Sequence, residues 1–173
     1  MACRAGRQLL GVAGLVFLAT GCGASGEPDD SDRAYAVLGT GNIEFEALAD
    51  GDDIAIVHGM QGGYHFFGSA RMTGLIPGDG TDLTNPDNPT TTFTVTRDGQ
   101  RIDANIAGYV QGYRPLPDTD LVELIPRVVV LDIEDDAELD GATVEFTVTI
   151  TDVTGATASD TKSLIAVPHP DNP

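Results

Sequence analysis

Residues 142–152 (ATVEFTVTITD) alternate strictly between apolar and polar side chains. The apolar side of this segment carries Val144, Phe146, Val148 and Ile150. Successive side chains of a β-strand point to opposite faces, so a period of two predicts a half-buried strand. Similar short segments recur from residue 35 onward, and no helical period of useful length follows residue 22. The chain is therefore predicted to form an all-β, antiparallel sandwich over residues 34–168.

Residues 54–74 are predicted to lie at the centre of this sandwich. A Gly-rich bend at residues 59–63 separates two apolar segments. After the bend, alternation places Phe66 and Met72 on one face of a strand and His65 on the other. This pattern predicts a central hairpin or a corner where the chain passes from one sheet to the other.

Further strands are predicted from alternation and turn residues. Asp98-Gly99 favours positive φ at both central turn positions, which predicts a hairpin between residues 92–96 and 101–106. Residues 43–47 are predicted to form a first half-buried strand, and residues 127–133 a strand rich in β-branched residues. The Pro-rich stretch 76–89 is expected to be a long surface loop, and residues 169–173 a disordered tail.

The N-terminus has the pattern of an export signal. Arg4 and Arg7 precede a short apolar run at residues 9–19, which is too short to span a bilayer. The run ends in Ala-Thr-Gly-Cys, with Cys22 last. This ending resembles the lipobox of bacterial lipoproteins, although the pattern prefers Leu where Ala19 stands. The resemblance implies cleavage of residues 1–21 and lipidation of Cys22.

The residues that follow Cys22 extend this expectation. Gly23 stands next to Cys22 where an inner-membrane lipoprotein would carry Asp, so the resemblance implies export onward to the outer membrane. Residues 22–33 are small, polar and acidic, and are predicted to be a flexible tether. Because Cys3 would leave with the signal and Cys22 would carry lipid, the mature domain would contain no free thiol.

The closing segment also carries a resemblance. Residues 143–167 contain a Thr-rich strand, a TVTITDVTG turn region and a Thr/Ser-rich return strand. This arrangement resembles the final strand pair of bacterial immunoglobulin-like and PKD-like extracellular domains. The resemblance implies an immunoglobulin-like fold and an exported location, and it implies no functional site.

Charge limits the classes of partner. The chain has 27 acidic residues against nine basic ones, with a formal net charge of −18. Such a surface repels phosphate backbones, so nucleic acid is excluded as a partner. The same acidity is compatible with Ca²⁺ binding.

Two sets of residues are candidate metal ligands. His58, Met60 and His65 offer imidazole and thioether ligands of the kind that Cu(I) favours, whereas Met72 is expected in the core. Oxygen ligands for Ca²⁺ could come from two acidic segments. The acidic candidates are Asp79, Asp82, Asp135 and Asp136. Neither segment has an EF-hand pattern, and the same residue types are common in ordinary turns and exposed hairpin ends.

Catalysis is not predicted, and a binding role is. Ser69 lies four extended residues beyond His65, about 13 Å away, which is too far for proton transfer. Tyr109, Tyr113 and Arg114 form a candidate binding surface, because Tyr supplies large contact area at low entropic cost. We therefore expect a lipid-anchored, non-enzymatic binding or assembly module whose partner is an envelope protein or a glycan. A metal-handling envelope lipoprotein, with calcium before copper, is the alternative.

Overall fold

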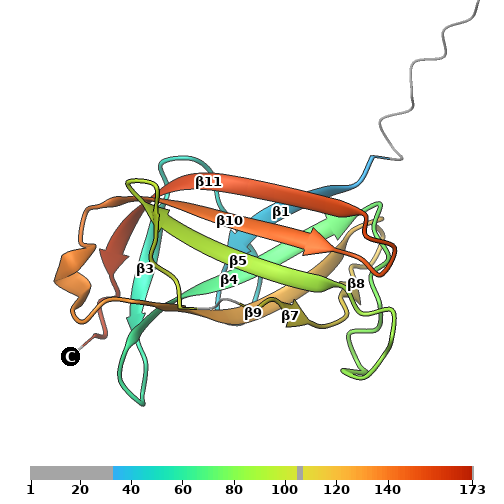
Figure 1. Cartoon of the computed structure of the whole chain (residues 1–173), viewed down its shortest axis with the longest axis horizontal. Helices are drawn as coiled ribbons and strands as arrows, with labels where there is room; N and C mark the ends of the chain where they lie inside the picture. Colours follow the sequence, from blue (N-terminus) through green and yellow to red (C-terminus); the bar gives the residue numbers. More distant parts are fainter. Residues whose placement is uncertain (1–32, 105–106, 173) are drawn as a thin grey trace, which may run out of the picture.

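The computed structural model describes residues 33–104 and 107–172 (Figure 1). The predicted signal at 1–21, Cys22 and all but the last residue of the predicted tether lie outside these residues. The described chain folds into two β-layers packed face to face (Figure 1). The first layer contains β1 (Tyr35–Thr40), β2 (Glu46–Ala47), β4 (Tyr64–Thr73), β8 (Arg114–Pro115) and β9 (Val122–Leu131).

The second layer is built around the closing hairpin. It contains β5 (Thr90–Arg97), β6 (Gln100–Arg101), β7 (Tyr109–Val110), β10 (Thr143–Thr151) and β11 (Thr157–Pro168). A short 3-10 helix, η2 (Asp136–Glu138), precedes β10. β3 (Asp53–His58) belongs to both layers, since its first residues pair with β11 and its last two pair with β4. The predicted inter-sheet corner is therefore confirmed.

The strand order agrees with the predicted all-β sandwich. β1, β4, β9 and β8 pair in that order in one layer, and β5, β10 and β11 pair in that order in the other, as in an all-β sandwich. One pairing departs from the antiparallel prediction. β3 runs parallel to β11, with Asp53 opposite Ile165.

The residues of β10 that alternation places on the apolar face are buried in the core. Phe146 on β10 is fully buried, with its ring centroid 5.9 Å from that of Phe66 and 5.7 Å from that of Phe93. Val148 and Ile150 are also fully buried. The opposite face of this sheet is covered by hydroxyl side chains. Thr147 and Thr161, paired across β10 and β11, are joined by a 2.8 Å hydrogen bond.

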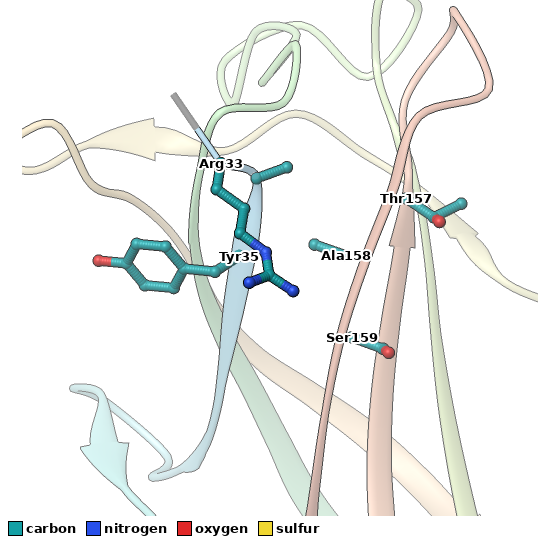
Figure 2. Close-up of a pocket in the computed structure, with 6 residues that line it drawn as sticks. Arg33, Tyr35, Thr157, Ala158 and Ser159 are labelled. Carbon is teal, nitrogen blue, oxygen red and sulfur yellow. The ribbon is translucent and has the colours of Figure 1, made fainter. Parts of the chain in front are cut away.

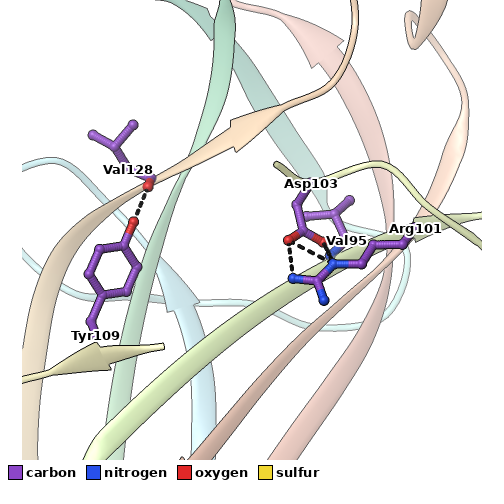
Figure 3. A network of polar contacts seen from close by, with 5 residues as sticks. All are labelled: Val95, Arg101, Asp103, Tyr109 and Val128. Atoms are coloured by element: carbon purple, nitrogen blue, oxygen red, sulfur yellow. Dashed lines mark hydrogen bonds and ion pairs between the residues drawn. The ribbon is translucent and has the colours of Figure 1, made fainter. Parts of the chain in front are cut away.

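The two layers are hydrogen-bonded to each other along one further edge. Ile102 and Ala104 bond to the backbone of β9 at Asp132 and Val130, and Asp103 bridges Leu131. The Asp103 side chain accepts a 2.8 Å bond from the Val95 amide and pairs with Arg101 at 2.6 Å (Figure 3). That hydrogen bond raises the pKa of Arg101 above its ordinary value. The buried carboxylate of Asp103 therefore joins the two layers at this edge.

Three predicted elements differ from the structure. Residues 43–47 do not form a half-buried strand, because Ile43 is 87% exposed and only Glu46 and Ala47 pair with β1. The strand predicted at 101–106 ends in regular pairing at Arg101, since the chain then turns to β9. β9 begins at Val122, five residues earlier than predicted.

The described tail residues are held against β3, in contrast to the predicted disorder. Asn172 accepts a hydrogen bond from the His58 amide at 2.9 Å and donates to the Ile56 carbonyl at 2.9 Å. It also donates to Asp136 at 2.7 Å. The His169 amide adds a bond to Ile56. These contacts continue the sheet edge beyond β11.

Candidate functional site

A hollow of the described chain lies where β1 and β11 face each other without pairing. On β11, Ser163 and Ile165 exchange backbone bonds with the β3 side, whereas Ala166 bonds towards β10. β11 pairs with β10 without a register shift, so odd-numbered residues of β11 direct their backbone groups away from β10 as far as the start of the strand. The amide and carbonyl groups of Ser159 and Thr161 therefore point towards β1.

The edge of β1 that faces β11 also has backbone groups that point away from its paired neighbour, β4. Leu38 accepts a bond from Leu48 on the side away from β4, so even-numbered residues of β1 direct their backbone groups outward. Ala36 thus points towards β11. Within the described part of the chain, no strand pairs with β1 at Ala36 or with β11 at Ser159 on the edges that face each other, although the other edges pair with β4 and β10. We call this region, residues 33–38 and 157–161, the slot.

The slot encloses about 740 Å³ at its open end (Figure 2). Its walls are Arg33, Ala34 and Tyr35 on one side and Thr157, Ala158 and Ser159 on the other. Figure 2 shows the Arg33 guanidinium directed from β1 towards β11. Arg33 is the only charged residue of this lining. The lining of the open end therefore carries one positive charge, on a chain of net charge −18.

The inner end of the slot is closed by side chains. Asp160 accepts a 2.8 Å hydrogen bond from the Leu38 amide and pairs with Lys162 at 2.7 Å. Both side chains point inward from β11, the direction taken by the buried Ala158 and Leu164. Inward-pointing charges are a common protection of edge strands. In the sequence, Asp160 and Lys162 interrupt the apolar face of β11, and this interruption is the signal that could have located the slot.

The candidate copper ligands are not brought together. His58 pairs with Tyr64, and His65 lies on the opposite face of the β3–β4 hairpin against Phe67, with ring centroids 5.0 Å apart. Met60 at the turn is fully exposed. Met72 is fully buried in the core, as predicted. The hairpin itself has the predicted bend, with Gly59 bonded to Gly63.

The candidate calcium ligands are engaged in local turns. Asp79 accepts bonds from the Thr81 amide and hydroxyl, which lower the pKa of its carboxyl. Asp82 accepts the equivalent bonds from Thr84. Asp135 caps η2, and Asp136 accepts a bond from Asn172. Over residues 33–104 and 107–172, no three His, Cys, Asp or Glu side chains form a group that could hold a metal ion.

The predicted aromatic surface is divided between core and edge. Tyr113 is only 1% exposed, and its hydroxyl lies 2.7 Å from that of Thr91, so it is a core residue and not a surface one. Burial raises the pKa of Tyr113 far above its ordinary value. Tyr109 is half-buried, and its hydroxyl donates to the Val128 carbonyl at 2.7 Å (Figure 3). Of the three residues, Arg114 alone is exposed.

The burial of His65 predicts a pH-dependent stability. Desolvation lowers the pKa of His65 below its ordinary 6.5. The unfolded chain then takes up this proton at a higher pH than the folded chain, so the free energy of unfolding falls as the pH drops below about 6.5 and levels off below the folded-state pKa. His65→Gln should flatten this slope in denaturant titrations between about pH 7 and pH 5. An unchanged slope would contradict the assignment.

Comparison with known proteins adds no constraint on function. No family model, curated protein or solved structure was found to match the chain. Among the described residues, no helix has the length and apolar character needed to cross a bilayer.

Proposed function

We propose that this chain is an exported, lipid-anchored, non-enzymatic binding module that receives an extended segment of a partner polypeptide in the slot. The observation that carries the proposal is that two strand edges without a strand partner, one on β1 and one on β11, face each other beside a hollow of about 740 Å³. A peptide added to such an edge gains backbone hydrogen bonds without depending on particular side chains. The proposal belongs to the class of binding and assembly modules that the sequence favours.

The slot also favours one kind of partner segment. The open stretch of β11, residues 157–159, lies outside the Leu38–Asp160 bond and matches about three residues of extended chain at roughly 3.3 Å per residue. Arg33 supplies one positive charge beside this stretch. We therefore expect a β-prone segment with small side chains and one acidic residue near Arg33.

A proline substitution tests this mode of binding. Ser159→Pro removes one slot-facing amide, while the bonds between β11 and β10 remain, because Ser159 directs its backbone away from β10. The proposal expects the partner recovered with the anchored protein from its native envelope to fall about ten-fold. Ser159→Val keeps the amide and serves as the control. Recovery of equal amounts of partner with Ser159→Pro and Ser159→Val would contradict the strand-addition proposal.

The anchor is tested separately. Cys22→Ser removes the acceptor of the lipid, and each buried CH₂ of an acyl chain contributes about 0.8 kcal/mol to membrane attachment. We expect the variant to remain unprocessed or to leave the membrane fraction. Fractionation and mass spectrometry of the mature N-terminus measure both outcomes. A variant that is processed normally and stays in the membrane would refute lipidation at Cys22.

A further inference from the structure

A second hollow lies on the outer face of the first layer, away from the slot. It has a volume of about 410 Å³, within the range of sites for small organic ligands. Its floor contains Val57 of β3 and Phe67 of β4. Both side chains point outward, because their neighbours Ile56 and Phe66 are buried in the core. The floor is thus apolar and half-buried.

The wall of this hollow depends on the ordered tail. Asn172 bonds to both the amide of His58 and the carbonyl of Ile56, which brings His169 to the rim. The Asp171 amide donates to His169 Nδ1 at 3.2 Å. In the neutral ring the proton then lies on Nε2, which can donate to a ligand. On another side, the Thr40 hydroxyl donates to the Phe67 carbonyl at 2.9 Å and fixes the loop that carries Asn42.

Two carboxylates stand at the rim without a positive partner. Glu46 and Asp53 are exposed, and within the described chain neither forms an ion pair or a side-chain hydrogen bond. The lining contains no Lys or Arg. In a chain of net charge −18, both carboxylates attract a cation. Phe67 can add a favourable contact between its ring face and a positive group.

We propose that this hollow binds an organic ammonium ion, whose charged group lies between Glu46 and Asp53 and whose apolar body lies on Val57 and Phe67. A bare metal ion would leave the apolar floor unused. A neutral sugar would leave the two negative charges without compensation. The proposal does not depend on the slot, because the residues that line the two hollows are different.

The test uses benzylammonium as the probe and benzyl alcohol as its neutral analogue. The full chain is purified in detergent micelles, and amide shifts are followed by NMR during titration. We expect benzylammonium to shift the amides of Asn42, Val57 and His169, with affinity that falls as NaCl is raised. Benzyl alcohol should bind at least about ten-fold more weakly, since it lacks the charge.

Three variants make the result specific. Glu46→Gln and Asp53→Asn should each weaken benzylammonium binding about five-fold, as expected for an exposed charge pair. Asp120→Asn removes an exposed charge that does not line the hollow and should leave the affinity unchanged. Equal affinity for benzyl alcohol, or equal loss with Asp120→Asn, would overturn the proposal. Binding of glucose at the same amides without binding of benzylammonium would also overturn it, in favour of a neutral polyol.

Discussion

Val148→Asp should unfold the domain or lower its free energy of unfolding by about 4 kcal/mol or more. Val148 is fully buried between the two layers, and the described residues around it are apolar core side chains. An aspartate there would carry an unpaired charge or would have to take up a proton. Chemical denaturation followed by far-ultraviolet circular dichroism measures the loss.

The neighbouring position supplies the control. Thr149 points to the hydroxyl-covered outer face of the second layer, between Thr92 and Ser159. Thr149→Asp places the same charge in contact with water and should cost less than about 1 kcal/mol. Equal losses at the two positions would mean that the faces of β10 are assigned the wrong way round.

Asp103→Ala should cost about 3 kcal/mol of unfolding free energy. The Asp103 side chain is fully buried, accepts the Val95 amide and pairs with Arg101 where the second layer meets β9. Its removal leaves the buried Val95 amide unsatisfied and takes away the ion pair with Arg101 (Figure 3). The Arg101 charge can still reach water, because its side chain is 40% exposed, so the Val95 amide accounts for most of the cost.

Two variants make this second prediction specific. Asp120→Ala removes an exposed carboxylate and should change stability by less than about 0.5 kcal/mol. Asp103→Asn retains an acceptor for the Val95 amide and should lose less than Asp103→Ala. A loss at Asp103 no larger than that at Asp120 would show that this edge is not held by the carboxylate.

Local periodicity was enough to predict the core. The buried face of β10 follows from alternation, because this strand packs one face on the other layer, whereas β4 also buries His65 and Ser69 on the face opposite Phe66. The Asp98-Gly99 turn was also predictable, since both residues adopt the positive φ that its type requires. The hairpin between β3 and β4 followed from the Gly-rich bend between two apolar segments.

The features that determine the candidate sites depend on contacts between distant segments. The residues next to Tyr113 in the sequence are typical of a binding loop, yet the Tyr113 hydroxyl is hydrogen-bonded to that of Thr91 inside the core. Asn172 orders the tail only because β3 and η2 are near it in space. The slot forms because β3 pairs only with residues 165–168 of β11, so that at the start of β11 the edge opposite β10 has no strand partner among the described residues. Local alternation does not identify the partners of these long-range pairings, although the interruption of the apolar face of β11 by Asp160 and Lys162 marks one end of the slot.

Hydrogen exchange tests the central proposal most directly. It is measured by mass spectrometry on the protein in its own isolated membranes and again after purification in detergent. If the slot receives a partner strand, peptides covering residues 33–38 and 157–162 exchange more slowly in the membranes than after purification, because their slot-facing amides lose a partner, while peptides from β10 exchange equally slowly in both. Equal exchange of the slot peptides in the two preparations would contradict the proposal that a partner strand fills the slot.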